Sequence, residues 1–408
     1  MGPAFKIAWR YFRGKKSAQA INIISWISIG AIAVSSAAMI VLFSVFNGLE
    51  DTVKGMYYAF NPEIKVTAEK GKFFAVTNDQ LQRIRRIPGV AIASLTLEDM
   101  VLLTGDEEQR VGKLKGVDDN WFKVSHLDSF MTDGEASWPQ HGSYTPAIMG
   151  LGVSIALGID VNNAFSGLHI YYPKQGIPAS DDPEAGLNNI VVKPQGNFRI
   201  QDEFDGEYVL VPLAAASHLF GVGDRVSSVE IALKPGTGEG DIRQGLYTVL
   251  GNNITIENRF EQNKTFYMIM RSEKWAVYAI LLMVLLIASF NMIGSLSMVV
   301  LEKKKDIAIL KSMGARRTLV HSVFLIEGGL LALLGAFIGV LTGLLLCLGQ
   351  HYYGWISLPD GFIINAYPVL LQAQDFVLVI VTALAVGLLA AWYPAYKASR
   401  QAIYVREE

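Results

Sequence analysis

Few residues in this sequence have the types and spacing that catalysis or cofactor binding requires. Residues 14–17 read Gly-Lys-Lys-Ser, a fragment of a phosphate-binding loop that lacks both the upstream glycine and the Gly-Lys-Ser/Thr ending. The patterns HExxH, CxxC and GxSxG, which mark zinc hydrolases, redox dithiols and serine hydrolases, do not occur, and the six histidines are scattered. The sequence therefore predicts no enzyme active site, no metal site and no cofactor bound by this chain itself.

Two polar residues interrupt long apolar segments. Glu327 lies in residues 320–348, and Asn291 lies in residues 275–300. An ionisable side chain inside a membrane is a candidate for a transport function. We favour hydrogen bonding for both residues, near the inner membrane surface for Glu327 and between helices for Asn291, because an ion pathway would need more polar residues than these segments contain.

A basic stretch, Leu301–Arg317, separates these two apolar segments. Six of its seventeen residues are Lys or Arg, and only Glu302 and Asp306 oppose them. Its apolar residues have the spacing of a short helix, and a glycine follows where a C-cap would lie: Ile307, Ile309, Leu310, Met313 and Gly314. An apolar helix face suggests a docking surface for a partner protein. The alternative is a solvated turn whose charges only set the membrane topology.

The elements around these residues are membrane spans. The chain of 408 residues is 51% hydrophobic, which is too apolar for an ordinary soluble protein. Residues 23–46 carry no formal charge and are long enough, as a helix, to cross a hydrocarbon layer of about 30 Å. This run also exceeds the apolar core of a signal peptide, so we expect it to stay uncleaved. The sequence predicts four transmembrane helices, at residues 23–46, 275–300, 320–348 and 376–396.

Charge asymmetry predicts the orientation of these spans. The first 22 residues carry five Lys or Arg and no acid, whereas the connection 349–375 carries no Lys or Arg. Because basic loops stay in the cytoplasm, both termini and the loop 301–319 are expected inside. Residues 1–22 form either an amphipathic helix at the membrane surface, with its bases toward anionic lipid, or an arm that only sets topology. The cytoplasmic tail is residues 397–408.

The segment between the first two spans, residues 47–274, is large enough for a domain of its own. It alternates strand-like and helix-like runs, which predicts an α+β domain with two lobes and an insertion at about 106–224. Residues 50–274 hold 30 acids and 21 bases, a balance that argues against nucleic-acid binding. The loop Pro173–Leu187 is rich in Pro and Gly and is either a protruding element or a simple connection. Residues 260–271 are expected to form a continuous stalk helix leading into the second span.

Several stretches together resemble the permease subunit of the lipoprotein-releasing ABC transporter, the LolC/LolE family within the wider MacB/FtsX-like class. The resemblance runs through most of the chain. It rests on FKIAWRYFRGKK and the following INIISWISIGAIAVSSAAMIVLFSVFNGLE, on NPEI, GVSIALGID and LHIYYP, and on SFNMIGSLSMVVLEKKKDIAILKSMGA and YPAYKASR. It implies a bacterial inner-membrane protein whose exported domain resembles porter and Sabre-like lobes. It also implies a second permease copy or paralogue and a separate cytoplasmic ATPase that binds ATP and Mg.

The resemblance implies three sets of functional residues. The basic loop would be a coupling helix seated on the ATPase, through Glu302, Asp306, Ile307, Ile309, Leu310, Met313 and Gly314. A hook that binds a periplasmic lipoprotein carrier would lie at Pro173, Lys174, Gln175, Gly176, Ile177 and Pro178. A cavity for the acyl chains of a lipoprotein would be lined by Met39, Phe43, Phe46, Tyr278, Leu282 and Met283, although lipid contact or helix packing also accounts for these six.

The expected function is ATP-driven extraction of lipoproteins from the inner membrane and their transfer to a periplasmic carrier. Three alternatives stay open at this point. The first is MacB-like export of a peptide or small molecule, and the second is FtsX-like signalling across the membrane to a periplasmic partner. The third is a membrane-anchored structural or binding protein that has no ATPase.

Overall fold

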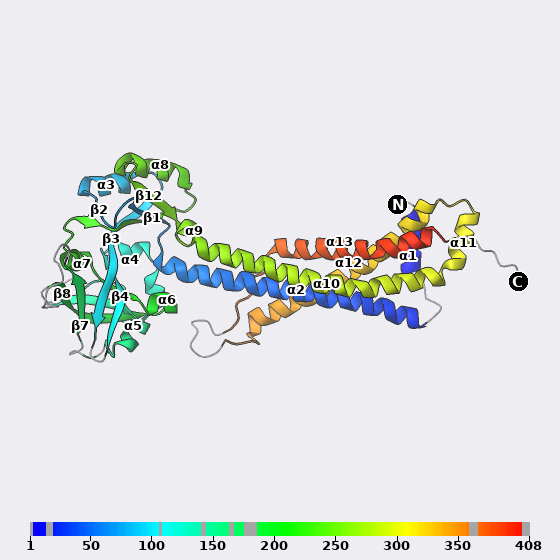
Figure 1. Ribbon diagram of the computed structural model, residues 1–408, viewed down its shortest axis with the longest axis horizontal. Helices are drawn as coiled ribbons and strands as arrows, with labels where there is room; N and C mark the ends of the chain where they lie inside the picture. The colour runs from blue at the N-terminus through cyan, green and yellow to red at the C-terminus, as the bar shows by residue number, and fades with distance from the viewer. Residues whose placement is uncertain are drawn as a thin grey trace. The chain divides into compact units, whose positions relative to one another are not determined.

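The computed structural model describes residues 3–13, 19–105, 108–139, 144–161, 163, 167–174, 186–358 and 366–401 (Figure 1). The chain divides into two compact units, which are described separately. The membrane unit comprises Met1–Thr52 and Met268–Glu408, and the α+β unit comprises Val53–Tyr267. Helices α2 and α10 contribute residues to both units.

Helices make up almost all of the membrane unit. They are α1 (Pro3–Arg13), α2 (Gln19–Phe60), α10 (Lys264–Glu302), α11 (Lys304–Ser312), α12 (Arg317–Tyr353) and α13 (Ala373–Ser399). Within the described part of the chain, α2, α10, α12 and α13 are long and apolar enough to cross a membrane. The prediction of four transmembrane helices is therefore confirmed. The helices run past the expected spans, since α2 continues to Phe60 and α12 continues to Tyr353.

Small residues on α12 allow its backbone to approach α2 and α13 closely. A Cβ added at Gly339 would lie 2.3 Å from the Ala33 carbonyl oxygen of α2. On α13, a Cβ added at Gly387 would lie 2.2 Å from the Ala332 Cβ of α12. Helices in lipid associate through such close packing, because burial from water supplies no drive there. The α2–α12–α13 packing is therefore tight, and larger side chains at these positions would disrupt it.

The described residues of the α+β unit build one sheet of ten strands and a separate two-stranded ribbon. The order of the large sheet is β12-β1-β11-β3-β4-β9-β6-β8-β5, with β7 paired to β3 and β8. Its pairs are antiparallel except β4–β9 and β6–β8. The strands are β1 (Ile64–Ala68), β3 (Val90–Thr104), β4 (Gln109–Val117), β5 (Met131–Asp133), β6 (Thr145–Gly150), β7 (Leu168–Pro173), β8 (Leu187–Phe198), β9 (Tyr208–Pro212), β11 (Ser228–Leu233) and β12 (Ile254–Asn258). The ribbon pairs β2 (Phe74–Ala75) with β10 (Arg225–Val226).

Helices flank this sheet and form separate apolar cores with it. They are α3 (Asn78–Arg86), α4 (Trp121–Val124), α5 (Leu151–Ala156), α6 (Asp202–Asp205), α7 (Leu213–Phe220), α8 (Glu239–Leu250), α9 (Arg259–Gln262) and a 3-10 turn at Leu127–Phe130. One core lies under α3 and α8, and another lies under α7. The long strand β3 supplies residues to both cores. The α+β region between the first two spanning helices is thus confirmed, and the stretch 106–224 is joined to the rest of the sheet through the pairing of β4 with β3.

A third, aromatic core of the α+β unit surrounds Phe60, the last residue of α2. The Phe60 ring lies 5.6 Å from Trp121, 4.9 Å from Phe204 and 4.6 Å from Tyr208, measured between ring centroids. Beneath these rings, Lys115 Nζ of β4 lies 2.8 Å from Glu230 Oε1 of β11. The aromatic rings and this buried ion pair fix the end of α2 within the α+β unit.

The stalk differs from its prediction at one residue. A continuous helix was expected over 260–271, but α9 ends at Gln262 and α10 begins at Lys264. Asn263 lies between them with φ −119° and ψ 31°, and its carbonyl accepts the Tyr267 N–H at 3.1 Å. Asparagine is unfavourable inside helices and favourable just before them, which explains why a new helix starts here.

Candidate functional site

The basic loop folds into a short helix with the expected end. Helix α11 occupies Lys304–Ser312, between the ends of α10 and α12. Gly314 has φ 87°, and the Ala315 N–H donates to the Leu310 carbonyl at 3.0 Å. This is the left-handed C-cap geometry that glycine favours, because a Cβ is strained at positive φ. The predicted helix and its cap glycine are both present.

The apolar residues of α11 do not all lie on one exposed face. Ile307 is only 2% exposed and packs in the core of the membrane unit. Ile309 is 58% exposed and Met313 is 78% exposed, whereas Leu310 is half-buried. Within this chain Ile307 therefore packs inward and anchors α11, whereas the side chains of Ile309 and Met313 point outward.

Charged residues hold α11 in place at both ends. At its start, Lys303 Nζ lies 3.7 Å from Asp306 Oδ2 and 5.4 Å from the centre of the Tyr11 ring of α1. Glu302 is half-buried at the end of α10. At the other end, Lys311 Nζ donates to the backbone carbonyls of Ser399 at 3.0 Å and Gln401 at 2.6 Å. Partial burial of Lys311 lowers its pKa. In the sequence Lys311 is only one of the six bases of the basic stretch, and no local pattern indicated this link to the end of α13.

The six candidate cavity residues have different surroundings. Met39 and Phe43 are buried in the core of the membrane unit, and Phe46, Tyr278 and Leu282 are half-buried. The Phe43 and Tyr278 rings stack with centroids 6.1 Å apart, and Tyr278 Oη lies 2.9 Å from Thr382 Oγ1. Met283 alone among the six is exposed. Helix packing therefore accounts for Met39 and Phe43, which are not open to cargo in this arrangement.

Glu327 and Asn291 also differ from each other. Glu327 is 1% exposed and packs inside the membrane unit on α12. Asn291 is exposed on α10, so its side chain is not buried between helices of this chain. Ser295 makes an interhelical contact instead, with its Oγ 3.2 Å from Ser25 Oγ of α2. A polar contact between helices thus exists one turn away from Asn291, at Ser295.

A polar cluster that the sequence analysis did not identify joins three helices of the membrane unit. Lys274 Nζ of α10 donates to Asn47 Oδ1 of α2 at 2.8 Å and lies 3.3 Å from Asp375 Oδ1 of α13. Asn47 Nδ2 in turn donates to Asp375 Oδ2 at 2.6 Å. We call these three residues the polar clasp. The sequence does contain a sign of this cluster, because each of the three polar residues stands at the border of an expected span.

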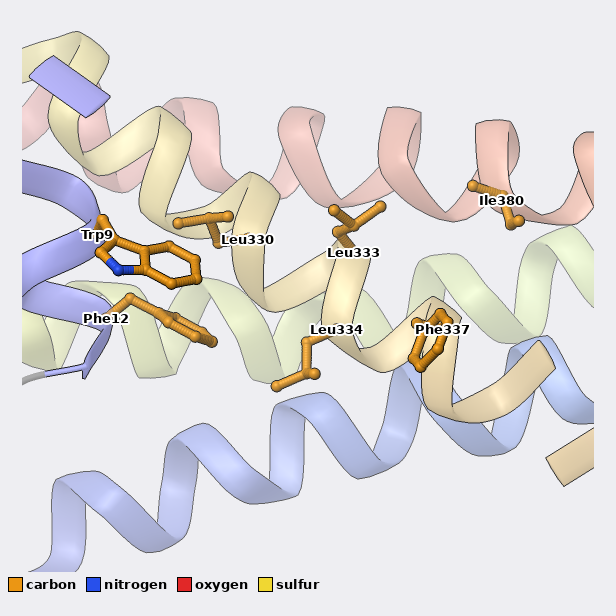
Figure 2. Close-up of a pocket in the computed structure, with 7 residues that line it drawn as sticks. All are labelled: Trp9, Phe12, Leu330, Leu333, Leu334, Phe337 and Ile380. Carbon is orange, nitrogen blue, oxygen red and sulfur yellow. The ribbon is translucent and has the colours of Figure 1, made fainter. Parts of the chain in front are cut away.

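An apolar pocket of about 330 Å³ lies between α1, α12 and α13 (Figure 2). Trp9 and Phe12 of α1 project toward Leu330 and Leu334 of α12, and the pocket continues along α12. Its lining is Trp9, Phe12, Leu330, Leu333, Leu334, Phe337 and Ile380. Pockets lined in this way suit hydrocarbon rather than a polar solute.

The predicted hook lies largely outside the described residues. Pro173 ends β7 opposite Leu187 of β8, and the Lys174 N–H donates to the Gly186 carbonyl at 2.9 Å. The loop therefore joins two antiparallel, paired strands. Gln175, Gly176, Ile177 and Pro178 lie outside the part of the chain that the structure describes.

Residues 278–403, which include most of α10 and all of α11–α13, match the family described as FtsX-like permease C-terminal. This part of the chain is thus similar to an FtsX-like permease domain, and it contains three of the four described helices that are long and apolar enough to cross a membrane. Over nearly its full length it is similar to lipoprotein-releasing system transmembrane proteins. It is 24% identical to LolE of Haemophilus influenzae, covering 98% of each chain. It is 25% identical to LolC of Xylella fastidiosa strain Temecula1, covering 97% of this chain and 96% of that one.

These matches confirm the resemblance inferred from the sequence. Among solved structures, the periplasmic region of MacB from Actinobacillus actinomycetemcomitans is 10% identical and aligns with a TM-score of 0.36. That alignment covers 52% of this chain and 94% of the MacB region. The likeness is too low to carry an argument about details of the fold.

Proposed function

We propose that this chain is the permease subunit of an ABC transporter that extracts lipoproteins from the inner membrane and passes them to a periplasmic carrier. The observation that carries the proposal is its similarity to LolE and LolC over nearly the whole of each chain. The four apolar helices and the large domain between the first two support it. No bond chemistry is assigned to this chain.

The energy of membrane anchoring explains why such a protein needs ATP. Each buried CH₂ of an acyl chain contributes about 0.8 kcal/mol to membrane binding. A lipoprotein with several chains therefore does not leave the membrane at a useful rate unaided. A transporter can offer an alternative apolar site and then close it, with ATP and Mg bound by a separate cytoplasmic ATPase.

Helix α11 is the proposed contact with that ATPase. Ile309 and Met313 are four residues apart, so they lie on the same side of the helix, and both are exposed. Lys303–Asp306 and the Lys311 link hold the helix in place, which would let a push on α11 act on α10 and α13. The basic residues around it support a cytoplasmic position, with both termini on the same side.

A second copy of this chain, or a paralogue, is the proposed partner for α10. Only 22% of the apolar window of α10 is buried within the chain, compared with 50% for α2 and 39% for both α12 and α13. An amide exposed to hydrocarbon is costly, and Asn291 is exposed on this helix. A facing helix would give Asn291 a hydrogen-bonding partner and cover the exposed apolar residues near it.

Reconstitution tests the transport function directly. The chain with its co-purifying ATPase is placed in proteoliposomes with an acylated lipoprotein and a soluble carrier. Lipoprotein-stimulated hydrolysis and transfer to the carrier are the expected results. Stimulated hydrolysis without transfer would contradict extraction and favour transmembrane signalling, and the absence of any ATPase partner would contradict the proposal as a whole.

Substitutions on α11 test the coupling surface. Ile309→Asp with Met313→Asp should abolish ATPase association while membrane insertion is unchanged. Ser312→Asp adds a charge at another exposed position of α11 and is the matched control. Unchanged ATPase binding in the double variant would contradict the coupling role of α11.

The carrier contact is proposed at the loop that joins β7 and β8. Deleting residues 176–184 should abolish carrier binding and leave basal ATP hydrolysis intact. Binding that persists after the deletion would show that the carrier docks elsewhere.

A further inference from the structure

Two kinds of contact meet at the polar clasp. Helix α2 is joined to the segment before α13 through the backbone: the Leu370 N–H donates to the Ser44 carbonyl at 2.9 Å. A Cβ added at Gly48 would lie 2.3 Å from the Pro368 carbonyl oxygen, so the two backbones are also in close contact. This joint can open only if that backbone hydrogen bond breaks and the close packing is lost.

Helix α10 reaches the same joint through side chains. Lys274 contacts Asn47 and Asp375 there, and its Nζ lies 5.7 Å from the centre of the Phe43 ring. Further along the helix, Tyr278 and Ser295 contact α13 and α2 through single hydroxyl groups, and buried apolar residues of α10 pack in the core of the membrane unit. The Lys274 side chain is 29% exposed, so water can replace its protein partners when it withdraws. Asp375 is only 8% exposed and keeps the Asn47 amide as a donor after Lys274 has left. At the clasp, therefore, the end of α10 can separate while Asn47 of α2 stays bonded to Asp375 of α13.

We propose that Lys274 is a latch that holds α10 against the α2–α13 pair and that its release lets α10 separate from α2. This inference rests on the proposed function in one respect: separation of α10 from α2 would admit an apolar cargo beside Phe43 and Tyr278, which stack across this seam. The latch itself is a property of the helices and can be tested without cargo.

A distance measurement in lipid nanodiscs tests the latch. Cys347 is replaced by Ser, and spin labels are attached at Ile280 of α10 and Leu345 of α12, which are both exposed. Lys274→Met should raise the population with α10 displaced about fivefold, as expected for the loss of a partly exposed ion pair. Lys274→Arg should restore most of the compact population, because it keeps the charge.

Two further variants keep the result interpretable. The double variant Lys274→Met with Asp375→Asn should show the same displacement of α10 as Lys274→Met alone, because the latch is already lost. It also removes the buried carboxylate, so unfolding caused by an unpaired charge cannot explain the displacement. Lys304→Met removes an exposed charge near the other end of α10 and should change nothing. Identical distance distributions in wild type and both Lys274→Met variants would overturn the latch. Displaced α10 with normal lipoprotein transfer would leave the latch intact and contradict its place in extraction.

The pocket in Figure 2 carries a second, independent inference, because α1 supplies two of its aromatic lining residues and also carries exposed bases. Lys6 and Arg10 are exposed and lie four residues apart, on one side of α1. Trp9 and Phe12 line the pocket, and the Phe5, Trp9 and Phe12 rings form a row with centroids 6.3 and 6.0 Å apart. From Leu330 to Phe337 the pocket wall runs along about two turns of α12, roughly 10 Å.

We infer that this pocket binds one acyl chain of an anionic phospholipid whose phosphate is held by Lys6 and Arg10. Exposed basic groups on a helix that lines a pocket between membrane helices suit a negatively charged headgroup. The row of aromatic rings suits the level of the membrane surface, where amphipathic helices lie. A zwitterionic lipid would fill the same apolar space but would gain less from the two bases.

Native mass spectrometry of the purified complex tests this site with phosphatidylglycerol and phosphatidylcholine as probes. One phosphatidylglycerol should be retained preferentially, and Lys6→Gln with Arg10→Gln should remove that preference. Leu333→Trp, which fills the pocket, should prevent retention of either lipid. Lys304→Gln with Lys305→Gln removes two exposed bases elsewhere and should leave the preference unchanged. Equal retention of the two lipids by wild type, or an unchanged preference in the Lys6/Arg10 variant, would overturn the assignment.

Discussion

Two lysine–carboxylate pairs, one in each unit, have similar chemistry and different surroundings. In the α+β unit, Lys115 and Glu230 are 3% and 1% exposed, and their atoms lie 2.8 Å apart. In the membrane unit, Lys274 and Asp375 are 29% and 8% exposed, and their atoms lie 3.3 Å apart. The first pair is closed on all sides, whereas the second reaches the surface through its lysine.

The neighbours of each pair explain the difference. Glu230 also accepts a hydrogen bond from Trp121 Nε1 at 2.7 Å and from Thr96 Oγ1 at 3.3 Å. Lys115 Nζ lies 4.7 Å from the centre of the Phe60 ring and 4.9 Å from that of Trp121. A charge taken fully out of water needs such partners permanently, because removing one leaves the other unpaired. A partly exposed charge can exchange its protein partner for water, so the first arrangement suits a rigid support and the second a contact that opens.

The largest loss of stability is expected from breaking the buried Lys115–Glu230 ion pair. Lys115→Met leaves Glu230 buried without its cation, which should destabilise the α+β unit by about 3–5 kcal/mol. Thermal unfolding of the full chain in detergent, followed by the fluorescence of its tryptophans, measures this loss. Lys115→Met with Glu230→Leu should recover most of the stability. A single variant that melts like wild type would mean that the pair is not the support described above.

Acid should weaken the same pair. The Lys115 ammonium holds the pKa of Glu230 below its usual range, with help from the Lys65 charge and the Trp121 hydrogen bond, against the opposing effect of burial. A carboxyl with a lowered pKa in the folded state adds stability above its unfolded pKa and loses it as the pH falls through the folded value. Stability should therefore decline below about pH 4. The Lys115→Met/Glu230→Leu variant should show a shallower decline in melts between pH 6 and pH 3, and an equal slope would contradict this origin.

A smaller loss of stability is expected from breaking the polar clasp. Lys274→Met should lower the stability of the membrane unit by only about 1 kcal/mol, because partial exposure weakens the ion pair and Asn47 still donates to Asp375. Unfolding by a denaturing detergent, compared between wild type, Lys274→Met and Lys274→Arg, measures the loss. A cost as large as that of Lys115→Met would remove the distinction between the two pairs.

The smallest loss of stability is expected at an ion pair that is exposed to solvent. Arg83 Nη2 and Asp79 Oδ2 on α3 lie 2.7 Å apart, with side chains that are 64% and 68% exposed. Arg83→Ala should change stability by less than about 0.5 kcal/mol, because solvent screens such pairs. Melting in low and high salt checks this, and a loss above 1 kcal/mol would show that exposure does not rank these ion pairs.

Local patterns predicted some elements of this protein well. The four apolar runs became α2, α10, α12 and α13, and Gly314 caps α11 where the helical spacing placed it. Hydropathy over a span and a glycine after a helical repeat depend on neighbouring residues, so sequence alone contains the information. Helix faces were harder to predict. Ile307 turned inward and Asn291 outward because each orientation depends on which other helix packs nearby.

The amino-acid sequence by itself determined the membrane class, the helix count, the basic loop and the absence of a phosphate-binding motif, because these follow from composition and local spacing. Only the tertiary structure brought Asn47, Lys274 and Asp375 together across more than 300 residues of chain. It also buried Lys115 against Glu230, which are more than 100 residues apart in the sequence. A long-range contact of this kind depends on how complete helices and strands pack against one another. For that reason the closed support and the opening clasp could be told apart only in the folded molecule.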